Sequence, residues 1–330
     1  MTSTRRGVIF AALVLACLAG AAVAVIAGLG KDEPRVATTE AARRALPDAQ
    51  AEGRPMLVLR SLKPRGQVAV APLGDTAGRR TFAPLSCERV YFAADRGLCL
   101  ARSGLATGLS AQVFGPDFRV QHKVELAGIP SRARVSADGR YGTVTSFVAG
   151  DSYAAAGAFS TRTTLIDMAR GEKLADLEQF TVTRDGRQVT AVDVNYWGVT
   201  FEPKDSDHFY ATMATGGRTY LIEGSIGDRT AHTIKTNVEC PSLSPDGTRI
   251  AYKKRVGPSS APWRLTVLDL RTMRETPLAE PKSIDDQAEW LDDGRVLYGR
   301  DGQVWVLPAD GSGSPSRYAA TADSPAAVRW

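Results

Sequence analysis

The sequence predicts an all-β fold, a six-bladed β-propeller of four-stranded blades that covers residues 55–330. Short apolar stretches separated by tight turns recur at intervals of about 40 to 50 residues, which is the spacing of propeller blades. The chain has 31 Gly and 18 Pro among 330 residues, and this composition favours many short strands joined by turns. Hydrophobic residues make up 43%, which is enough to build a core and excludes a wholly disordered chain.

The N-terminal region predicts export. Residues 7–30 form an uninterrupted apolar run, longer than the roughly 20 residues that a helix needs to cross a bilayer. The two arginines within residues 1–6 place the N-terminus in the cytoplasm. The run is either an uncleaved transmembrane signal anchor or a signal peptide cleaved at a site such as Ala22-Val23-Ala24, so the propeller is tethered outside the cell membrane or secreted. The apolar residues after Cys17 argue against a lipoprotein signal.

Residues 31–54 are polar, charged and rich in alanine, which is typical of a linker. A short helix can form over residues 38–46, but its apolar face is mostly alanine. We therefore expect a stalk rather than a domain.

Two consecutive units near the C-terminus show the repeat most clearly. In each unit an Asp-Gly turn joins the first two strands, and two further strands follow. The strands lie within Cys240–Tyr252, Trp263–Leu270 and Arg274–Leu278, and then within Ala288–Tyr298, Gln303–Leu307 and Ser316–Ala319.

Three earlier units follow the same frame less regularly. They begin with the strands Arg89–Ala93, Ala133–Val135 and Trp197–Phe201. A seventh blade is the alternative if the long stretch Phe180–Asn195 contains another unit.

The two ends of the propeller region complement each other. Met56–Arg60, Val68–Ala71 and Thr81–Ala83 supply three strands without a first strand, and Ala326–Trp330 is a first strand with nothing after it. Joining them completes the sixth blade and removes the exposed sheet edges of an open ring.

The turn sequence Ser-Pro-Asp-Gly at residues 244–247 recurs in degenerate form at 136–139 and 292–294. This pattern resembles the TolB-type propeller repeat, and residues 55–330 resemble the TolB-like translocation proteins of high-GC Gram-positive bacteria. The resemblance implies a propeller that recognises partner proteins. The N-terminal α/β domain of TolB has no counterpart in the linker, and we expect no second, hydrolase domain.

Propeller geometry predicts which face carries the function. The loops between second and third strands lie on the same face as the connections between blades, and we call this the crossover face. The long segments 149–161, 180–195 and 256–262 all belong to it, and long loops commonly carry function. Binding residues are therefore expected near its centre, at Asp151, Ser152, Tyr153, Asn195, Tyr196 and Trp197. The alternative is that these segments are decorations without a binding role.

Acidic residues recur where the inner strands begin on the crossover face. They are Glu88, Asp193, Glu239, Asp285, Asp286 and Asp323, with Arg132 as the exception. A ring of carboxylates could hold Ca²⁺ or attract a basic peptide. A water-filled tunnel that tolerates polar residues is the alternative.

Signals for catalysis are scarce. The three histidines are isolated, without the spacing of a zinc site, and the sequence has neither a Gly-x-Ser-x-Gly elbow nor a phosphate-binding loop. Asp205–His208 contains the residue types of a catalytic triad, but consecutive residues cannot supply its geometry, and we expect a turn. Carboxylates of the acidic ring could serve glycoside hydrolysis. We expect neither a cofactor nor a bound metal.

Export permits a disulfide between Cys87 and Cys99, which flank the first strand of one blade. A register that places Cys99 opposite about Ala93 leaves the two sulfurs too far apart, so both states remain open. Cys240 is expected to be a buried free thiol.

Four tryptophans, Trp263, Trp290, Trp305 and Trp330, are expected in the core, and Trp197 is expected to contact a ligand.

These features together predict a monomeric, non-enzymatic propeller that binds an envelope protein or peptide outside the cell membrane. A propeller that binds a glycan, a small molecule or a cation, or a carbohydrate-active enzyme, is the alternative. The net charge of +5 is too small and too evenly mixed with acids to indicate nucleic-acid binding.

Overall fold

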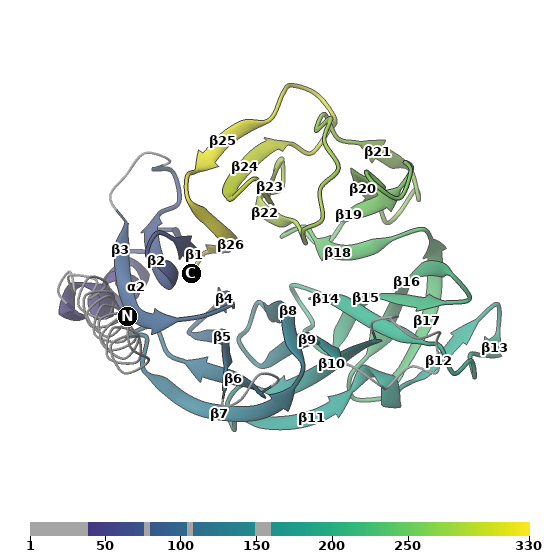
Figure 1. Cartoon of the computed structure of the whole chain (residues 1–330), viewed down its shortest axis with the longest axis horizontal. Helices are drawn as coiled ribbons and strands as arrows, with labels where there is room; N and C mark the ends of the chain where they lie inside the picture. The colour runs from purple at the N-terminus through teal and green to yellow at the C-terminus, as the bar shows by residue number, and fades with distance from the viewer. Residues whose placement is uncertain (1–38, 76–79, 104–107, 149–159) are drawn as a thin grey trace, which may run out of the picture. The chain divides into compact units, whose positions relative to one another are not determined.

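The computed structural model describes residues 39–75, 80–103, 108–148 and 160–330 (Figure 1). The chain from residue 38 onward forms one compact unit. The predicted membrane-spanning run at 7–30 and the residues before it lie outside the described residues. In the described part of the chain, no helix is long and apolar enough to cross a membrane.

Six β-sheets are arranged as blades around a central axis, which confirms the predicted six-bladed propeller (Figure 1). From the inside outwards, blade 1 consists of β26 (Ala322–Val328), β1 (Met56–Leu62), β2 (Arg65–Pro72) and β3 (Thr81–Ser86). Blade 2 consists of β4 (Arg89–Ala93), β5 (Arg96–Arg102), β6 (Gly108–Phe114) and β7 (Val120–Ala127). Blade 3 consists of β8 (Ile129–Val135), β9 (Tyr141–Val148), β10 (Ser160–Asp167) and β11 (Glu172–Asp176).

The second half of the ring repeats this arrangement. Blade 4 contains β14 (Asn195–Phe201), β15 (His208–Thr215), β16 (Arg218–Ser225) and β17 (Thr230–Thr236). Blade 5 consists of β18 (Glu239–Leu243), β19 (Arg249–Arg255), β20 (Trp263–Asp269) and β21 (Glu275–Pro277). Blade 6 consists of β22 (Glu289–Asp292), β23 (Arg295–Arg300), β24 (Gln303–Pro308) and β25 (Ser316–Ala319).

The ring closes through blade 1 as predicted. The C-terminal strand β26 pairs antiparallel with β1, with Ala326 opposite Val58. Each inner strand contacts the inner strand of the next blade, and β26 contacts β4. The contacts between inner strands therefore run around the whole ring.

The stretch from residue 180 to 195 does not form a seventh blade. After the short 3-10 helix η1 (Leu177–Gln179) it forms the hairpin of β12 (Thr181–Arg184) and β13 (Arg187–Gln188). β12 pairs in parallel with β17, so the sheet of blade 4 has six strands. Two strands this short cannot bury the faces of a separate blade, and the hairpin instead extends an existing sheet.

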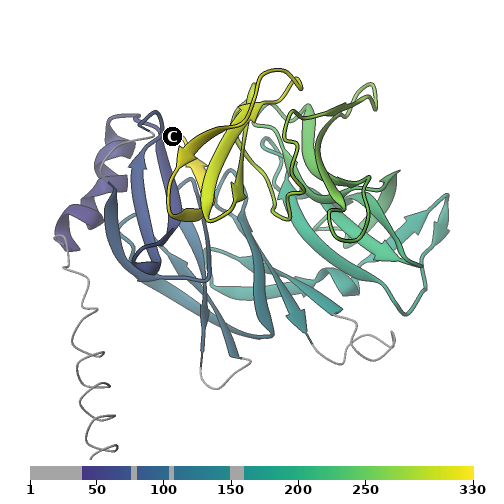
Figure 2. The same ribbon diagram turned by 45° about the horizontal axis from the view of Figure 1, so that its top comes forward.

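The region predicted to be a linker contains helix α2 (Thr39–Ala51). Ala42, Leu46 and Ala49 recur at helical spacing and are fully buried. The helix contacts β2 and β3, and it lies against blade 1 in Figure 2. The folded unit therefore begins well before residue 55. Two of the three buried side chains are alanines, so the sequence gives only a weak signal that this helix has an apolar face.

Cys87 and Cys99 are joined by a disulfide, and their Cα atoms are 5.4 Å apart. Cys99 lies opposite Val90 and not opposite Ala93, so the predicted register is wrong. The turn between β4 and β5 is tighter than predicted, and Ala94 adopts a left-handed conformation there with φ of 52°. This register brings Cys99 close to Cys87, which lies two residues before β4 begins.

Candidate binding site

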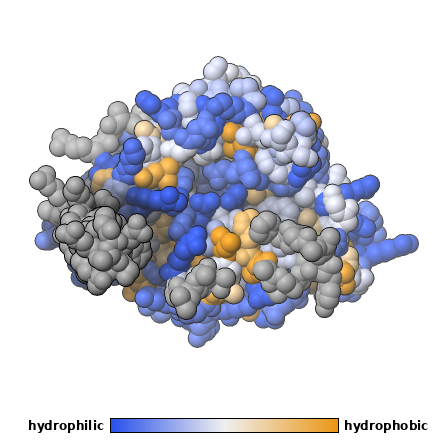
Figure 3. All heavy atoms as spheres, viewed as in Figure 1, coloured by the Kyte–Doolittle hydropathy of each residue, from blue (hydrophilic) through white to orange (hydrophobic). Residues whose placement is uncertain are grey.

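A cavity of about 540 Å³ opens on the crossover face, at the end of the central tunnel. We call it the crossover cavity. It is formed by the starts of β8, β14 and β18 and by the ends of β9, β15 and β19, because all of these strand ends meet on that face. Viewed along the axis of the ring, the centre is hollowed and lined mainly by hydrophilic residues, with apolar side chains beside it (Figure 3).

The lining of the crossover cavity combines charged and aromatic side chains. Cys240 also lines it and is a buried free thiol, in agreement with the prediction. The charged and aromatic members are Arg89, Arg132, Glu239, Lys253 and Asp285, together with Phe147, Trp197 and Trp263.

Four of the residues predicted to form a site line the cavity, namely Asn195, Trp197, Glu239 and Asp285. Tyr196 does not, because successive side chains of a strand point to opposite faces of the sheet. It lies between Asn195 and Trp197 and is buried in the core of blades 3 and 4.

The remaining predicted site residues lie elsewhere. Asp193 accepts hydrogen bonds from the hydroxyl of Thr215 and the backbone of Gly216, outside the cavity. Asp286 lies deeper in the tunnel, where it accepts a hydrogen bond from the backbone of Gly299. The segment 151–153, with the predicted Asp, Ser and Tyr, lies outside the described residues.

Four of the six predicted ring carboxylates, Glu88, Glu239, Asp285 and Asp323, are paired with cations, so the ring does not form one acidic group. Arg60 donates two hydrogen bonds of 2.7 Å to the carboxylate of Asp323, and it lies 3.5 Å from Glu88. Arg255 lies 3.6 Å from Glu239. Burial raises the pKa of Glu239, although the nearby cations lower it in part. In the described ranges no three acidic, histidine or cysteine side chains converge as they would around a metal ion.

Trp263, predicted to be a core residue, is only partly buried and lies in the cavity wall. Lys253 Nζ is 4.5 Å from the centre of its ring and Arg255 Cζ is 4.2 Å from it. Lys253 also forms an ion pair with Asp285. Two cations therefore pack against one aromatic ring at the wall of the cavity.

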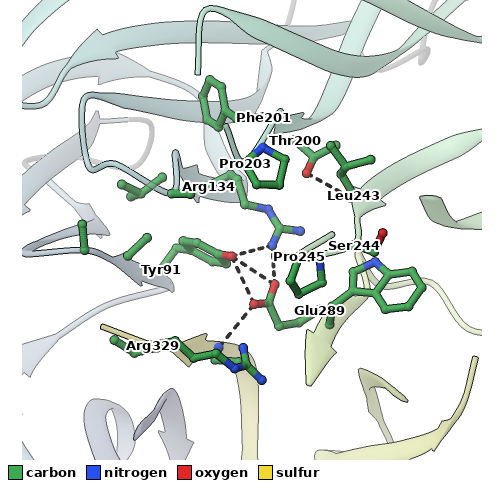
Figure 4. A pocket seen from close by; sticks show the side chains of 17 residues that line it. Tyr91, Arg134, Thr200, Phe201, Pro203, Leu243, Ser244, Pro245, Glu289 and Arg329 are labelled. Carbon is green, nitrogen blue, oxygen red and sulfur yellow. Dashed lines mark hydrogen bonds and ion pairs between the residues drawn. The ribbon is translucent and has the colours of Figure 1, made fainter. Parts of the chain in front are cut away.

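A buried polar cluster lies deeper in the tunnel. Arg134 of β8 and Glu289 of β22 form an ion pair, and their side chains are 7% and 8% exposed. The hydroxyl of Tyr91 lies 3.1 Å from both carboxylate oxygens of Glu289 and accepts a hydrogen bond from Arg134 at 2.9 Å (Figure 4). Burial alone would lower the pKa of Arg134, but Tyr91 and Glu289 hold it above its ordinary value. We call these three residues the Arg134 cluster.

The Arg134 cluster lies between two cavities. On one side is the crossover cavity, and on the other is a cavity of about 220 Å³ that reaches the turns between first and second strands. We call that opposite face the turn face. The tunnel is thus filled with a hydrogen-bonded ion pair at its centre, and the crossover cavity is a pocket with a polar floor.

The fold is that of a TolB-like six-bladed propeller. The sequence matches no protein-family model and no curated protein. Among solved structures, TolB from Acinetobacter baumannii is similar with a TM-score of 0.57 and 15% identity, over 83% of this chain and 66% of that chain. A chain of a nidogen/laminin complex is similar with a TM-score of 0.54 and 10% identity, over 83% of this chain and 98% of that chain. At these identities the similarity shows the fold alone.

Proposed function

We propose that this chain is a non-enzymatic protein-interaction module at the cell envelope and that it binds an extended segment of a partner protein in the crossover cavity. The observation that carries the proposal is the cavity of about 540 Å³, with three aromatic side chains in its wall and with two lining carboxylates, Glu239 and Asp285, that are held in ion pairs. Aromatic anchors combined with a few fixed polar groups are typical of binding pockets. The envelope location rests on the apolar run at residues 7–30.

The distribution of exposed apolar side chains also favours the crossover face as the binding face. Seven large hydrophobic side chains are exposed among the described residues, and four of them lie on the crossover face. They are Ile129, Phe147, Val192 and Val256. Exposed apolar groups around a polar pocket favour contact with another protein.

The titratable groups favour binding over catalysis. Asp205 and His208 contact each other at 2.8 Å within the turn between β14 and β15, far in the fold from the crossover face. In the cavity, Glu239 and Asp285 each form an ion pair with a cation. A glycosidase needs one carboxyl group that donates a proton and a second that acts on the sugar, and this pairing does not leave them free.

Site-specific photocrosslinking in the source cells tests the proposal with the full chain. A photoreactive amino acid at Ile129 or Val256 should give a crosslinked partner, and Trp263→Ala should reduce its yield. Matched positions on the turn face, Val120 and Met273, are also exposed and should give none. Equal crosslinking from both faces, or none from the crossover face, would overturn the proposal.

A further inference from the structure

Two guanidinium groups meet on one peptide oxygen at the floor of the crossover cavity. Arg89 Nε donates to the carbonyl oxygen of Ser131 at 2.8 Å, and Arg132 Nη1 donates to the same oxygen at 3.0 Å. Arg89 begins β4 and Arg132 belongs to β8, so neighbouring inner strands bring them together. Both side chains line the crossover cavity and the tunnel beneath it.

Among the described residues, neither guanidinium donates a hydrogen bond to a carboxylate. The hydrogen bonds of Arg89 go to the peptide oxygens of Ser131 and Glu88. Arg132 Nη2 lies 3.9 Å from Asp285, whose same oxygen already pairs with Lys253. The Nε of Arg132 is buried and has no acceptor.

The other cations of the tunnel differ in this respect. Arg60 is bound to Asp323 through two hydrogen bonds, and Arg134 is bound to Glu289. Asp286 is the remaining carboxylate near the arginine pair, and one of its oxygens accepts a hydrogen bond from Gly299. The pair therefore carries positive charge that its surroundings only partly balance.

The surroundings balance the charge of Arg89 less well than that of Arg132. Burial lowers the pKa of Arg89, and the charge of Arg132 lowers it further, while Asp286 and Asp323 act in the opposite direction. Burial alone would also lower the pKa of Arg132, but Cys240, Asp286 and Asp285 hold it above its ordinary value. Two like charges at the floor of a low-dielectric cavity repel each other. An anion between them would satisfy the free N–H groups and relieve the repulsion, because a guanidinium donates in a planar fork that matches a carboxylate.

We propose that Arg89 and Arg132 bind a carboxylate of the partner segment, either its C-terminal carboxylate or the side chain of an Asp or Glu residue. This inference rests on the proposed function, because it assumes that the partner segment enters the crossover cavity. The acidic residues of the same cavity leave the floor open to an anion, since Glu239 is paired with Arg255 and Asp285 with Lys253.

Peptide binding to the full chain in detergent micelles tests this inference. Three pools of short dansyl-labelled peptides are titrated and followed by fluorescence anisotropy. The first pool has free C-termini and no Asp or Glu, the second has amidated C-termini with Asp and Glu, and the third is amidated and lacks both. We expect binding of the first or the second pool and binding of the third that is weaker by about tenfold or more.

The variants Arg89→Gln and Arg132→Gln should weaken the preferred pool to the level of the third. Arg102→Gln is the matched control, because Arg102 is an exposed arginine of the same blade that pairs with Glu88 outside the cavity. Arg132→Lys keeps the charge but loses the fork, and it provides a second variant if a glutamine variant does not fold.

The possible outcomes separate the two proposals. Equal binding of all three pools would overturn the carboxylate site and leave peptide binding supported. Binding that survives both glutamine variants would also overturn the site. Binding of no pool would overturn the carboxylate site, and the crosslinking pattern would then decide the proposed function.

Discussion

Arg134 and Glu289 form an ion pair across the centre of the ring, from the inner strand of blade 3 to that of blade 6. Glu289 also accepts hydrogen bonds from Tyr91 of blade 2 and from the backbone of Ala327 in the closing strand β26. Arg134 donates in addition to Ser242 of blade 5. One buried pair thus connects five of the six blades, including the blade that both ends of the chain complete.

Replacing Glu289 by alanine should destabilise the propeller strongly, because it leaves the buried guanidinium of Arg134 without a counter-charge. A loss of about 3–5 kcal/mol in the free energy of unfolding is expected for such a change. Urea denaturation of both proteins measures it. Replacing both residues by methionine should restore most of the loss, since no buried charge then remains. A cost below about 1 kcal/mol for the single change would contradict this view of the cluster.

The repeat motif itself carries a pH dependence. Partial burial raises the pKa of Asp246, but hydrogen bonds from Ser244 and Thr248 outweigh this and lower it to about 2. The ordinary pKa of this carboxyl group, near 4, applies in the unfolded chain. The lowered pKa therefore stabilises the folded state when the pH is above about 4, and this contribution is lost as the pH falls towards about 2.

Asp246→Asn should therefore lower the free energy of unfolding at neutral pH. The difference in this free energy between the variant and the unaltered chain should shrink as the pH falls and vanish near pH 2. Denaturant unfolding at several pH values between about 2 and 7 measures that difference. Asp48→Asn, at an exposed position of α2, is the control and should show no such trend. A difference that does not change with pH would contradict the assigned hydrogen bonds.

The fold was predictable because its signals are local. In blade 5, Ser244 donates to Asp246 and the backbone of Thr248 donates to the same carboxylate, which fixes the turn between the first two strands. In blade 3, Ser136 and Asp138 repeat this contact. Each such turn therefore marks the start of a blade in the sequence, and the regular spacing of strands between and beyond these turns gives the number of blades.

The candidate site was only partly predictable. The starts of the inner strands alone suggest an acidic ring, but the end of each second strand lies beside the start of the first. Glu239 stands opposite Lys253 in this way, and Arg255 follows two residues later. These cations are visible in the sequence once both strand ends are considered. The pairing of Arg134 with Glu289 is not, because it depends on the diameter of the ring.

Helix α2 should behave as part of the propeller unit. Leu46 is fully buried in the same core as residues of β1, β2 and β3. Leu46→Ala should lower the free energy of unfolding by about 2–5 kcal/mol, because it leaves a cavity under the helix. Arg44→Ala is the control, since Arg44 is 70% exposed and should change stability by less than about 0.5 kcal/mol. If the two variants unfold at the same denaturant concentration, the helix is not docked as described.

The disulfide between Cys87 and Cys99 should stabilise blade 2. The two cysteines are 12 residues apart in the sequence. A cross-link over a loop of this length lowers the entropy of the unfolded chain and so raises the free energy of unfolding by about 2–4 kcal/mol. A reducing agent should therefore lower the melting temperature by several degrees, as measured by calorimetry.

The Cys240→Ala variant should respond to the reducing agent in the same way, because its only change is at the free thiol. The double variant Cys87→Ser and Cys99→Ser should melt at the lower temperature with or without the reducing agent. A response that persists in this double variant would show that the stabilising bond lies elsewhere.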